Sequence, residues 1–213
     1  MQFGISEFQV QSISEKVEYT LTENIRLSNV EKLWELGYDG EGMHIAVLDT
    51  GCDVSHKCLK DRIVETKNFI NGSDDVTDRN GHGTHVAGII AAKHNNGVGI
   101  SGICDNSKLI GVDWYPYLIP LWNTELAIYF GLSNCVKAGA KVVNFSLGTS
   151  SSSEGVYMSA MDESITPAAV SYMMASLLSK GYDFVAVQSA GNGDVNGDID
   201  AGGSVTVEGD YNG

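Results

Sequence analysis

Residues 45–48, Ile-Ala-Val-Leu, form an unbroken apolar run that ends abruptly on Asp49. Successive side chains of a strand point to opposite faces, so a run without polar residues predicts a strand buried on both faces. Such strands are typical of parallel sheets. Ligands bind at the carboxyl ends of the strands in these sheets, which is where Asp49 stands. The run therefore indicates both a fold and a place for chemistry.

The same pattern recurs along the chain. Largely apolar runs at 108–112, 142–145 and 184–187 predict three more strands. Helices are expected over 123–137 and from a Thr166-Pro167 start to a Gly181 stop. Strands that alternate with helices predict an α/β fold, a parallel β-sheet flanked by helices.

The start of the chain is read differently. Residues 1–27 are polar and weakly periodic, which indicates an N-terminal extension before one domain over 28–213. Ser28 and Glu31 have the spacing of a capping box, and Gly37 is a stop signal. We therefore expect a short helix between Ser28 and Gly37.

Composition excludes several classes of protein. The 213 residues contain 13 Lys and Arg against 27 Asp and Glu, a net charge of −14, with 43% hydrophobic residues. This hydrophobic content argues against disorder, and no apolar run reaches the roughly 18 residues of a membrane span. The negative charge disfavours nucleic acid and anionic membranes as partners.

The cysteines indicate in which cellular compartment the protein is expected. None of the four cysteines lies in a C-x-x-C pair, and the N-terminus lacks the pattern of a secretory signal. Reduced thiols in the cytoplasm are the expectation. The cysteines are Cys52, Cys58, Cys104 and Cys135.

The segment 80–92, N-G-H-G-T-H-V-A-G-I-I-A-A, surrounds His82 with small residues. Glycine lets the backbone approach other groups closely, and histidine is the usual general base near neutral pH. His82 and His85 are spaced to share a helical face, but no nearby Glu or Cys completes a zinc ligand set. We therefore predict a base near a helix start and no bound metal for the chemistry.

Two more strand ends carry candidate groups. Ser146-Leu147-Gly148 offers backbone groups to which an extended peptide could add as a strand. Asn192, among small residues, could donate a hydrogen bond to a developing oxyanion. Taken singly, Asp49 could equally be a cap, Asn192 a turn residue and Ser146 an ordinary strand end.

Taken together, these segments resemble the subtilisin family of serine peptidases, from about Val30 to Asn192. Asp49 in D-T-G and His82 in H-G-T-H-V-A-G match the first two members of that family's triad. The resemblance implies that Ser146-Leu147-Gly148 binds substrate and that Asn192 stabilises the oxyanion. It implies a serine-type endopeptidase acting on peptides or proteins, and Cys52 is reminiscent of the intracellular branch.

The family's nucleophile segment, G-T-S-M-A, does not follow Asn192 in this sequence. Gly148-Thr149-Ser150 shares three of its letters, but Ser151-Ser152-Ser153 comes next. We expect an N-terminal fragment, incomplete at the C-terminus and inactive alone, whose serine lies beyond Gly213. The alternative is a non-catalytic relative that binds peptides.

Calcium is a separate question. The segment 94–100, H-N-N-G-V-G-I, resembles the family's calcium-binding loop, which supplies oxygen ligands. The position that matches a carboxylate ligand holds Cys58, and a thiol is a poor calcium ligand. A structural calcium ion is therefore doubtful.

Two other motifs are rejected. Aspartic peptidases also use D-T-G, but they need two such carboxylates, and a second D-T-G or D-S-G is absent from the sequence. A homodimer could supply one, although the α/β pattern argues against it. Residues 97–102 match G-x-G-x-x-G, but they follow an expected helix and precede a strand, the reverse of a dinucleotide fingerprint.

Overall fold

A computed structural model describes residues 23–68, 72–97, 99–113, 124–146 and 171–188. The strands are β1 (His44–Asp49), β2 (Ile63–Asn68), β3 (Lys108–Asp113), β4 (Val142–Phe145) and β5 (Val185–Gln188). The helices are α1 (Glu23–Leu27), α2 (Val30–Glu35), α3 (His82–Ala91) and α4 (Thr124–Lys137), and residues 171–179 are also helical. All strand pairs are parallel, in the order β2-β3-β1-β4-β5, which confirms the expected α/β fold.

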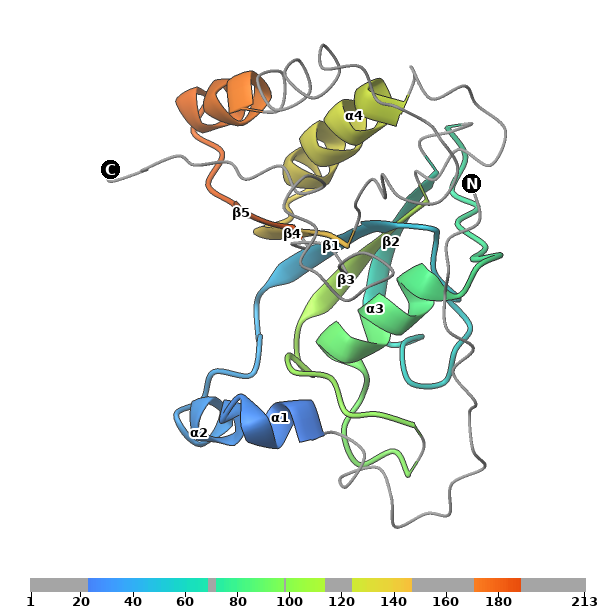
Figure 1. Ribbon diagram of the computed structural model, residues 1–213, viewed down its shortest axis with the longest axis vertical. Helices are drawn as coiled ribbons and strands as arrows, with labels where there is room; N and C mark the ends of the chain where they lie inside the picture. Colours follow the sequence, from blue (N-terminus) through green and yellow to red (C-terminus); the bar gives the residue numbers. More distant parts are fainter. Residues whose placement is uncertain (1–22, 69–71, 98, 114–123, 147–170, 189–213) are drawn as a thin grey trace, which may run out of the picture.

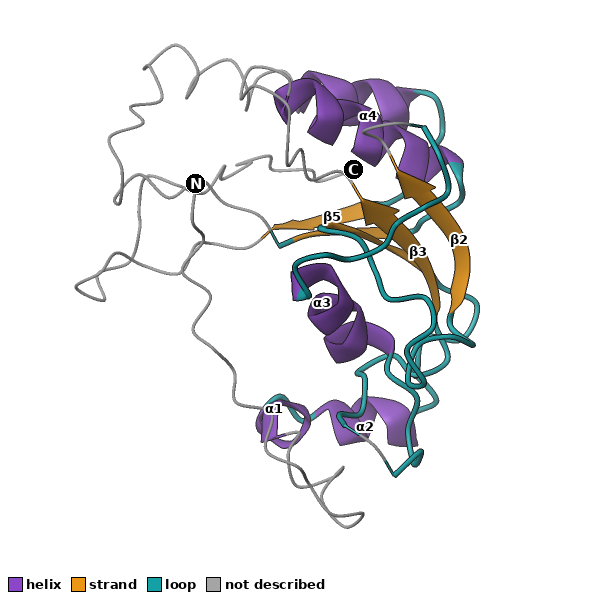
Figure 2. Cartoon of the chain, turned by 90° about the vertical axis from the view of Figure 1, so that its right-hand side faces the viewer, coloured by secondary structure: helices purple, strands orange, loops and turns teal. Residues whose placement is uncertain are grey.

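The sheet is the middle of three layers. Helix α3 covers one face, and α4 and the helix 171–179 lie over the other (Figures 1 and 2). The position of β1 between these helices explains why its sequence is apolar without interruption. Its Ile45 and Val47 pack in a cluster with Ala87 and Ala91 of α3. Its Ala46 and Leu48 belong to the opposite cluster, which contains Leu132, Val136, Met173 and Leu177.

β1 lies in the centre of the sheet, so its carboxyl end meets those of its neighbours. It pairs with β3 along its whole length, from His44 opposite Lys108 to Asp49 opposite Asp113. On its other side, Val47 pairs with Asn144 of β4. Asp49 and Ser146 each lie two residues beyond this pair, so both residues lie at the carboxyl edge of the sheet.

The backbone of β4 is already paired over most of its length. Residues 142–144 pair with β1 on one side and with β5 on the other. Any backbone edge that could receive a peptide must therefore begin after Asn144.

Two elements were not expected from the sequence. β2 has the sequence I-V-E-T-K-N, and its mixed composition reflects its position at the edge of the sheet. α1 lies within the segment read as an extension, and its Ile25 is fully buried.

The capping-box prediction for α2 is wrong. The N-cap residue is Asn29, which has a left-handed backbone (φ 58°), and no side chain caps the helix. A six-residue helix held by tertiary contacts does not depend on a cap, and Trp34 supplies such a contact by donating from Nε1 to the carbonyl of Ile103 (2.8 Å). Gly37, with φ 87°, follows the helix as predicted.

None of the helices in the described ranges is long and apolar enough to cross a membrane.

Candidate active site

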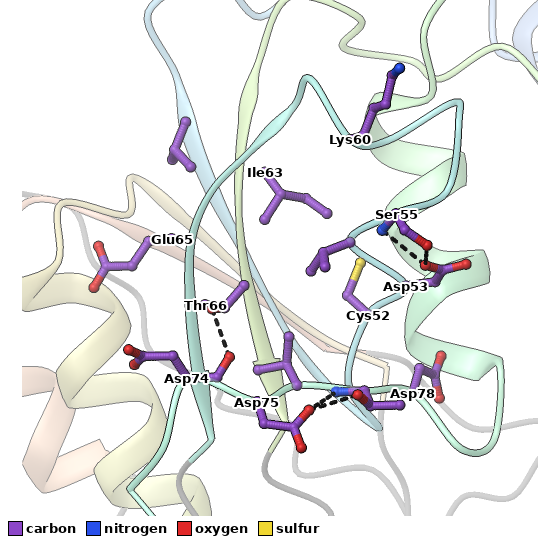
Figure 3. A pocket seen from close by; sticks show the side chains of 14 residues that line it. Cys52, Asp53, Ser55, Lys60, Ile63, Glu65, Thr66, Asp74, Asp75 and Asp78 are labelled. Carbon is purple, nitrogen blue, oxygen red and sulfur yellow. Dashed lines mark hydrogen bonds between the residues drawn. The ribbon is translucent and has the colours of Figure 1, made fainter.

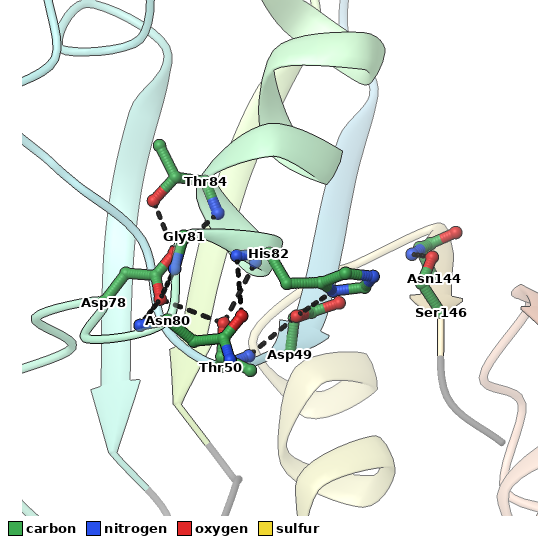
Figure 4. Close-up of polar contacts among 10 residues, drawn as sticks. Asp49, Thr50, Asp78, Asn80, Gly81, His82, Thr84, Asn144 and Ser146 are labelled. Atoms are coloured by element: carbon green, nitrogen blue, oxygen red, sulfur yellow. Dashed lines mark hydrogen bonds and ion pairs between the residues drawn. The ribbon is translucent and has the colours of Figure 1, made fainter. Parts of the chain in front are cut away.

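Asp49 and His82 meet at the carboxyl edge of the sheet (Figure 4). Asp49 is the last residue of β1 and is fully buried, whereas His82 is the first residue of α3 and its side chain is 39% exposed. Nδ1 of His82 lies 2.7 Å from Oδ1 of Asp49. The two residues that match the first two members of the subtilisin-family triad are therefore hydrogen-bonded to each other.

The buried carboxylate decides the state of the imidazole. The hydrogen bond to Asp49 is the main reason that the pKa of His82 is raised above its ordinary value; burial opposes it, and the negative charges of Asp49 and Asp78 add to it. Since Oδ1 of Asp49 can only accept, the neutral imidazole carries its proton on Nδ1. Nε2 is then left without a proton, as a general base requires.

The other interactions of Asp49 hold it in place. Its Oδ1 also accepts the backbone N–H of Thr50 at 2.8 Å. Its Oδ2 is buried and has no hydrogen-bond partner among the residues that the structure describes. Of the two carboxylate oxygens of Asp49, Oδ1 is thus bonded to His82, whereas Oδ2 has no hydrogen-bond donor among the described residues.

The start of α3 is fixed from outside the helix. Gly81 occupies the N-cap with φ 95° and has no side chain to accept a hydrogen bond. Asp78 supplies the missing acceptor: its Oδ2 accepts from the backbone N–H of Thr84 (2.9 Å) and from the Thr84 hydroxyl (2.6 Å). This carboxylate therefore caps the helix that carries His82.

Thr50 joins this cap to the strand. Its hydroxyl donates to Oδ1 of Asp78 (2.9 Å) and accepts the backbone N–H of Gly83 (3.0 Å). Neither Asp78 nor Thr50 was predicted as a functional residue from the sequence.

The remaining predicted site residues are only partly described. Ser146 lies one residue past β4, half-buried, and its Oγ accepts a hydrogen bond from Nδ2 of Asn144 (2.8 Å). Leu147, Gly148 and Asn192 lie outside the described residues, as does Ser150.

Cys58 faces the segment that resembles a calcium-binding loop. Cys58 is buried, and its Sγ lies 3.9 Å from where a Cβ on Gly99 would be, so the thiol faces this loop. A hard cation needs an oxygen ligand at such a position. Within the described ranges, no three His, Cys, Asp or Glu side chains are grouped so that they could hold a metal ion.

A cavity of about 700 Å³ lies beside β2, between the loop after β1 and residues 74–78 (Figure 3). Asp78 lines it, but Asp49 and His82 do not. Two of its carboxylates are occupied by local contacts, since Asp53 accepts from Ser55 and Asp75 accepts from Thr77. The cavity is therefore separate from the imidazole that could do chemistry.

A fully buried carboxylate that orients a partly exposed imidazole, at the carboxyl edge of a parallel sheet, is typical of α/β enzymes whose histidine activates a nucleophile. The profile of the Subtilase family (Peptidase_S8) matches residues 40–213, and the chain belongs to this family.

The chain is similar to several named proteases. It is 41% identical over 110 residues to the major intracellular serine protease of Bacillus subtilis (strain 168), covering 50% of this chain and 33% of that protein. It is 36% identical over 139 residues to subtilisin DY of Bacillus licheniformis, covering 63% and 47%.

The fold is also that of solved proteases. The MycP3 protease from the type VII (ESX-3) secretion system superposes with a TM-score of 0.62 at 26% identity, covering 81% of this chain and 46% of that structure. The chain thus spans between a third and a half of the length of these relatives.

Proposed function

We propose that this chain supplies the aspartate and histidine of a serine-type endopeptidase. The observation that carries the proposal is the 2.7 Å contact between the buried carboxylate of Asp49 and Nδ1 of His82, in a member of the Subtilase family. Asp49 holds the ring so that Nε2 faces away from the carboxylate. His82 takes the proton of a serine hydroxyl as that oxygen attacks the peptide carbonyl, and Asp49 stabilises the imidazolium that forms.

Binding of the substrate is assigned by resemblance. Ser146, Leu147 and Gly148 hold an extended peptide or protein segment through backbone hydrogen bonds. Asn192 donates to the oxyanion of the tetrahedral intermediate. The position of Ser146 at the same sheet edge as Asp49 supports this assignment.

The nucleophile is a serine outside these 213 residues. The sequence has no G-T-S-M-A segment after Asn192, and Ser150 is followed by a polar serine run. A continuation of the reading frame that contains such a segment completes the triad.

The proposal also includes the cellular location of the protein and the absence of a metal from its chemistry. The protein works in the cytoplasm, which is supported by relatives named as intracellular serine proteases in Bacillus subtilis and Paenibacillus polymyxa and by the absence of disulfides among the four cysteines. No metal is required for the chemistry in this proposal, and Cys58 argues against a structural calcium ion in the loop that it faces, because a thiol is a poor calcium ligand.

The test compares two forms of the protein, residues 1–213 and a form extended through the downstream G-T-S-M-A segment. Each is incubated with a fluorogenic peptide and with a serine-directed phosphonate. We expect turnover and labelling only in the extended form, and neither turnover nor labelling when its G-T-S-M-A serine is changed to alanine. His82→Ala should reduce turnover of the extended form to background.

Two results would contradict the proposal. Turnover by residues 1–213 that disappears in Ser150→Ala would make Ser150 the nucleophile. Peptide binding by the extended form without turnover would identify a non-catalytic peptide-binding relative.

A further inference from the structure

We propose that Asp78 is a positioning residue for His82, because its carboxylate and Thr50 together hold the first turn of α3 against the buried Asp49. The catalytic consequence rests on the proposed function, but the effect on the imidazole does not.

Asp78 gathers hydrogen bonds from both sides of the helix start (Figure 4). Oδ1 accepts from the backbone N–H of Asn80 (3.0 Å) and Gly81 (2.8 Å) and from the hydroxyl of Thr50 (2.9 Å). Oδ2 accepts twice from Thr84. Both carboxylate oxygens are therefore committed to holding the segment in which His82 lies.

Thr50 connects the two carboxylates. Its backbone N–H donates to Asp49, its hydroxyl donates to Asp78, and the same hydroxyl accepts the N–H of Gly83. The contacts form a closed ring that runs from Asp49 through Thr50 to Gly83 and returns through His82 to Asp49. A shift of Thr50 should therefore move the imidazole relative to Asp49, and Asp78 acts on this ring through its hydrogen bond with the Thr50 hydroxyl.

Apart from Asp78, the side chains of the described residues that accept an N–H group of the first turn are Thr50, from Gly83, and Asn80, from His82. Gly81 cannot cap, and the backbone N–H of His82 reaches only Oδ1 of the exposed Asn80, at 3.2 Å. The first turn of a helix has unpaired N–H groups and frays without a cap. His82 is the first residue of α3, so fraying there changes the position of the imidazole directly.

Asp78 is negatively charged at neutral pH. Burial acts to raise the pKa of its carboxyl group, but the hydrogen bonds from Thr84, Gly81 and Asn80 outweigh this effect and lower it. A negative charge is also favourable at the N-terminus of a helix. Its charge raises the pKa of His82, although less than the hydrogen bond to Asp49 does.

The test separates position from charge in the extended, active form of the protein. Thr50→Val removes the hydroxyl at nearly constant volume and leaves every charge in place, and Thr50→Ser restores the hydroxyl. Asp78→Asn removes one charge and the acceptor for Thr84. Asp75→Asn is the matched control, because Asp75 lies in the same loop but, within the described residues, its carboxylate accepts from Thr77 and not from the start of α3.

Two readouts are recorded for each variant. NMR follows the titration of His82, assigned with His82→Gln, and the exchange of its Nδ1 proton. Kinetics give kcat and KM separately. We expect Thr50→Val and Asp78→Asn to lower the pKa of His82, to speed exchange of the Nδ1 proton and to reduce kcat about tenfold at unchanged KM. Thr50→Ser and Asp75→Asn should resemble the parent protein.

The outcomes are distinct from those of the proposed function. If Thr50→Val leaves the titration and proton exchange of His82 unchanged, the positioning role is wrong, whether or not the parent protein cleaves peptides. If the titration shifts but the parent protein has no turnover, the positioning role stands and the peptidase proposal fails. Should Asp78→Asn fail to fold, the Thr50→Val and Thr50→Ser pair still decides the question.

Discussion

The backbone of Gly83 lies so close to Gly51 that a Cβ atom on Gly83 would overlap the carbonyl oxygen of Gly51 and come within 3.1 Å of Cβ of Asp49. α3 therefore approaches the end of β1 more closely than any residue with a side chain would allow at this position. This approach is what lets the first residue of the helix, His82, reach the last residue of the strand, Asp49.

Gly83→Ala should consequently separate α3 from β1. The obstacle is backbone, which cannot rotate away, so we expect a loss of about 1–3 kcal/mol in the free energy of unfolding. Denaturant unfolding measures this loss, and NMR should show a weaker hydrogen bond at Nδ1 of His82. Gly88→Ala on the same helix is the control.

A Cβ on Gly88 would lie 3.4 Å from Cδ1 of Ile100, an ordinary contact. Alanine also has the higher helix propensity, by about 1 kcal/mol. Gly88→Ala should therefore be neutral or slightly stabilising. Equal losses in the two variants would mean that the close approach at Gly83 does not matter.

The raised pKa of His82 predicts a pH dependence of stability. A group whose pKa is higher in the folded state stabilises the fold at pH values below its unfolded pKa of about 6.5, and this contribution is lost as the pH rises through the folded pKa. The difference in the free energy of unfolding between the parent protein and His82→Gln should thus be largest in acid. Unfolding curves across this range measure it.

Asp49→Asn tests whether the hydrogen bond with Asp49 causes the pH-dependent stability contributed by His82. This substitution removes the charged acceptor that raises the pKa of His82, so most of the pH-dependent difference should disappear. If the difference persisted in Asp49→Asn, the hydrogen bond between the two side chains would not be its source. In the active protein, the rise of kcat/KM with pH should likewise move to lower pH when the pKa of His82 falls.

Much of the fold could be predicted because its central strands are buried on both faces. β1, β3 and β4 must be apolar wherever helices cover both sides, and this requirement is visible in the sequence. β2 was not predicted because this edge strand buries fewer side chains, and Glu65 and Lys67 interrupt its apolar pattern. The other edge strand, β5, was predicted because its sequence begins with the apolar run V-A-V, although most of its residues are exposed. An apolar run, and not the position of a strand in the sheet, therefore decides which strands can be predicted from this sequence.

In the candidate site, too, local sequence patterns identify some residues and not others. Asp49 and His82 were predicted because each stands at a recognisable place, a strand end and a glycine-flanked helix start. The role of Asp78 depends on Thr50, which is 28 residues earlier in the chain, and no local pattern reports that contact. An acidic residue shortly before a helix start was the available signal, and it indicates only a cap.

The ion pair between Arg62 and Asp105 should stabilise the loop after α3. The side chains are only 14% and 19% exposed, and Asp105 also accepts from the backbone N–H of His94 (3.3 Å). Asp105→Ala leaves the Arg62 guanidinium without its carboxylate in a partly buried place, so we expect a loss of about 2 kcal/mol.

Lys67→Ala provides the comparison. Lys67 and Asp74 are 3.4 Å apart, with side chains 41% and 81% exposed. Exposed pairs are screened by water, and the loss should be below about 0.5 kcal/mol. Chemical denaturation measures both variants; a loss in Lys67→Ala as large as that in Asp105→Ala would show that burial of the ion pair is not what gives it its strength.

Calcium should become a ligand of the loop only when Cys58 is replaced by a carboxylate. In the parent protein the thermal midpoint should be the same in calcium and in a chelator, because the buried thiol faces the loop near Gly99. Cys58→Asp should be less stable in the chelator, since it buries a charge. Added calcium should then raise its stability by about 2.7 kcal/mol at one hundred times Kd, as expected for a ligand that binds only the folded state. Cys58→Ser, which adds polarity without charge, should not respond to calcium. A parent protein whose midpoint falls in the chelator would show instead that the loop binds calcium without a carboxylate at this position.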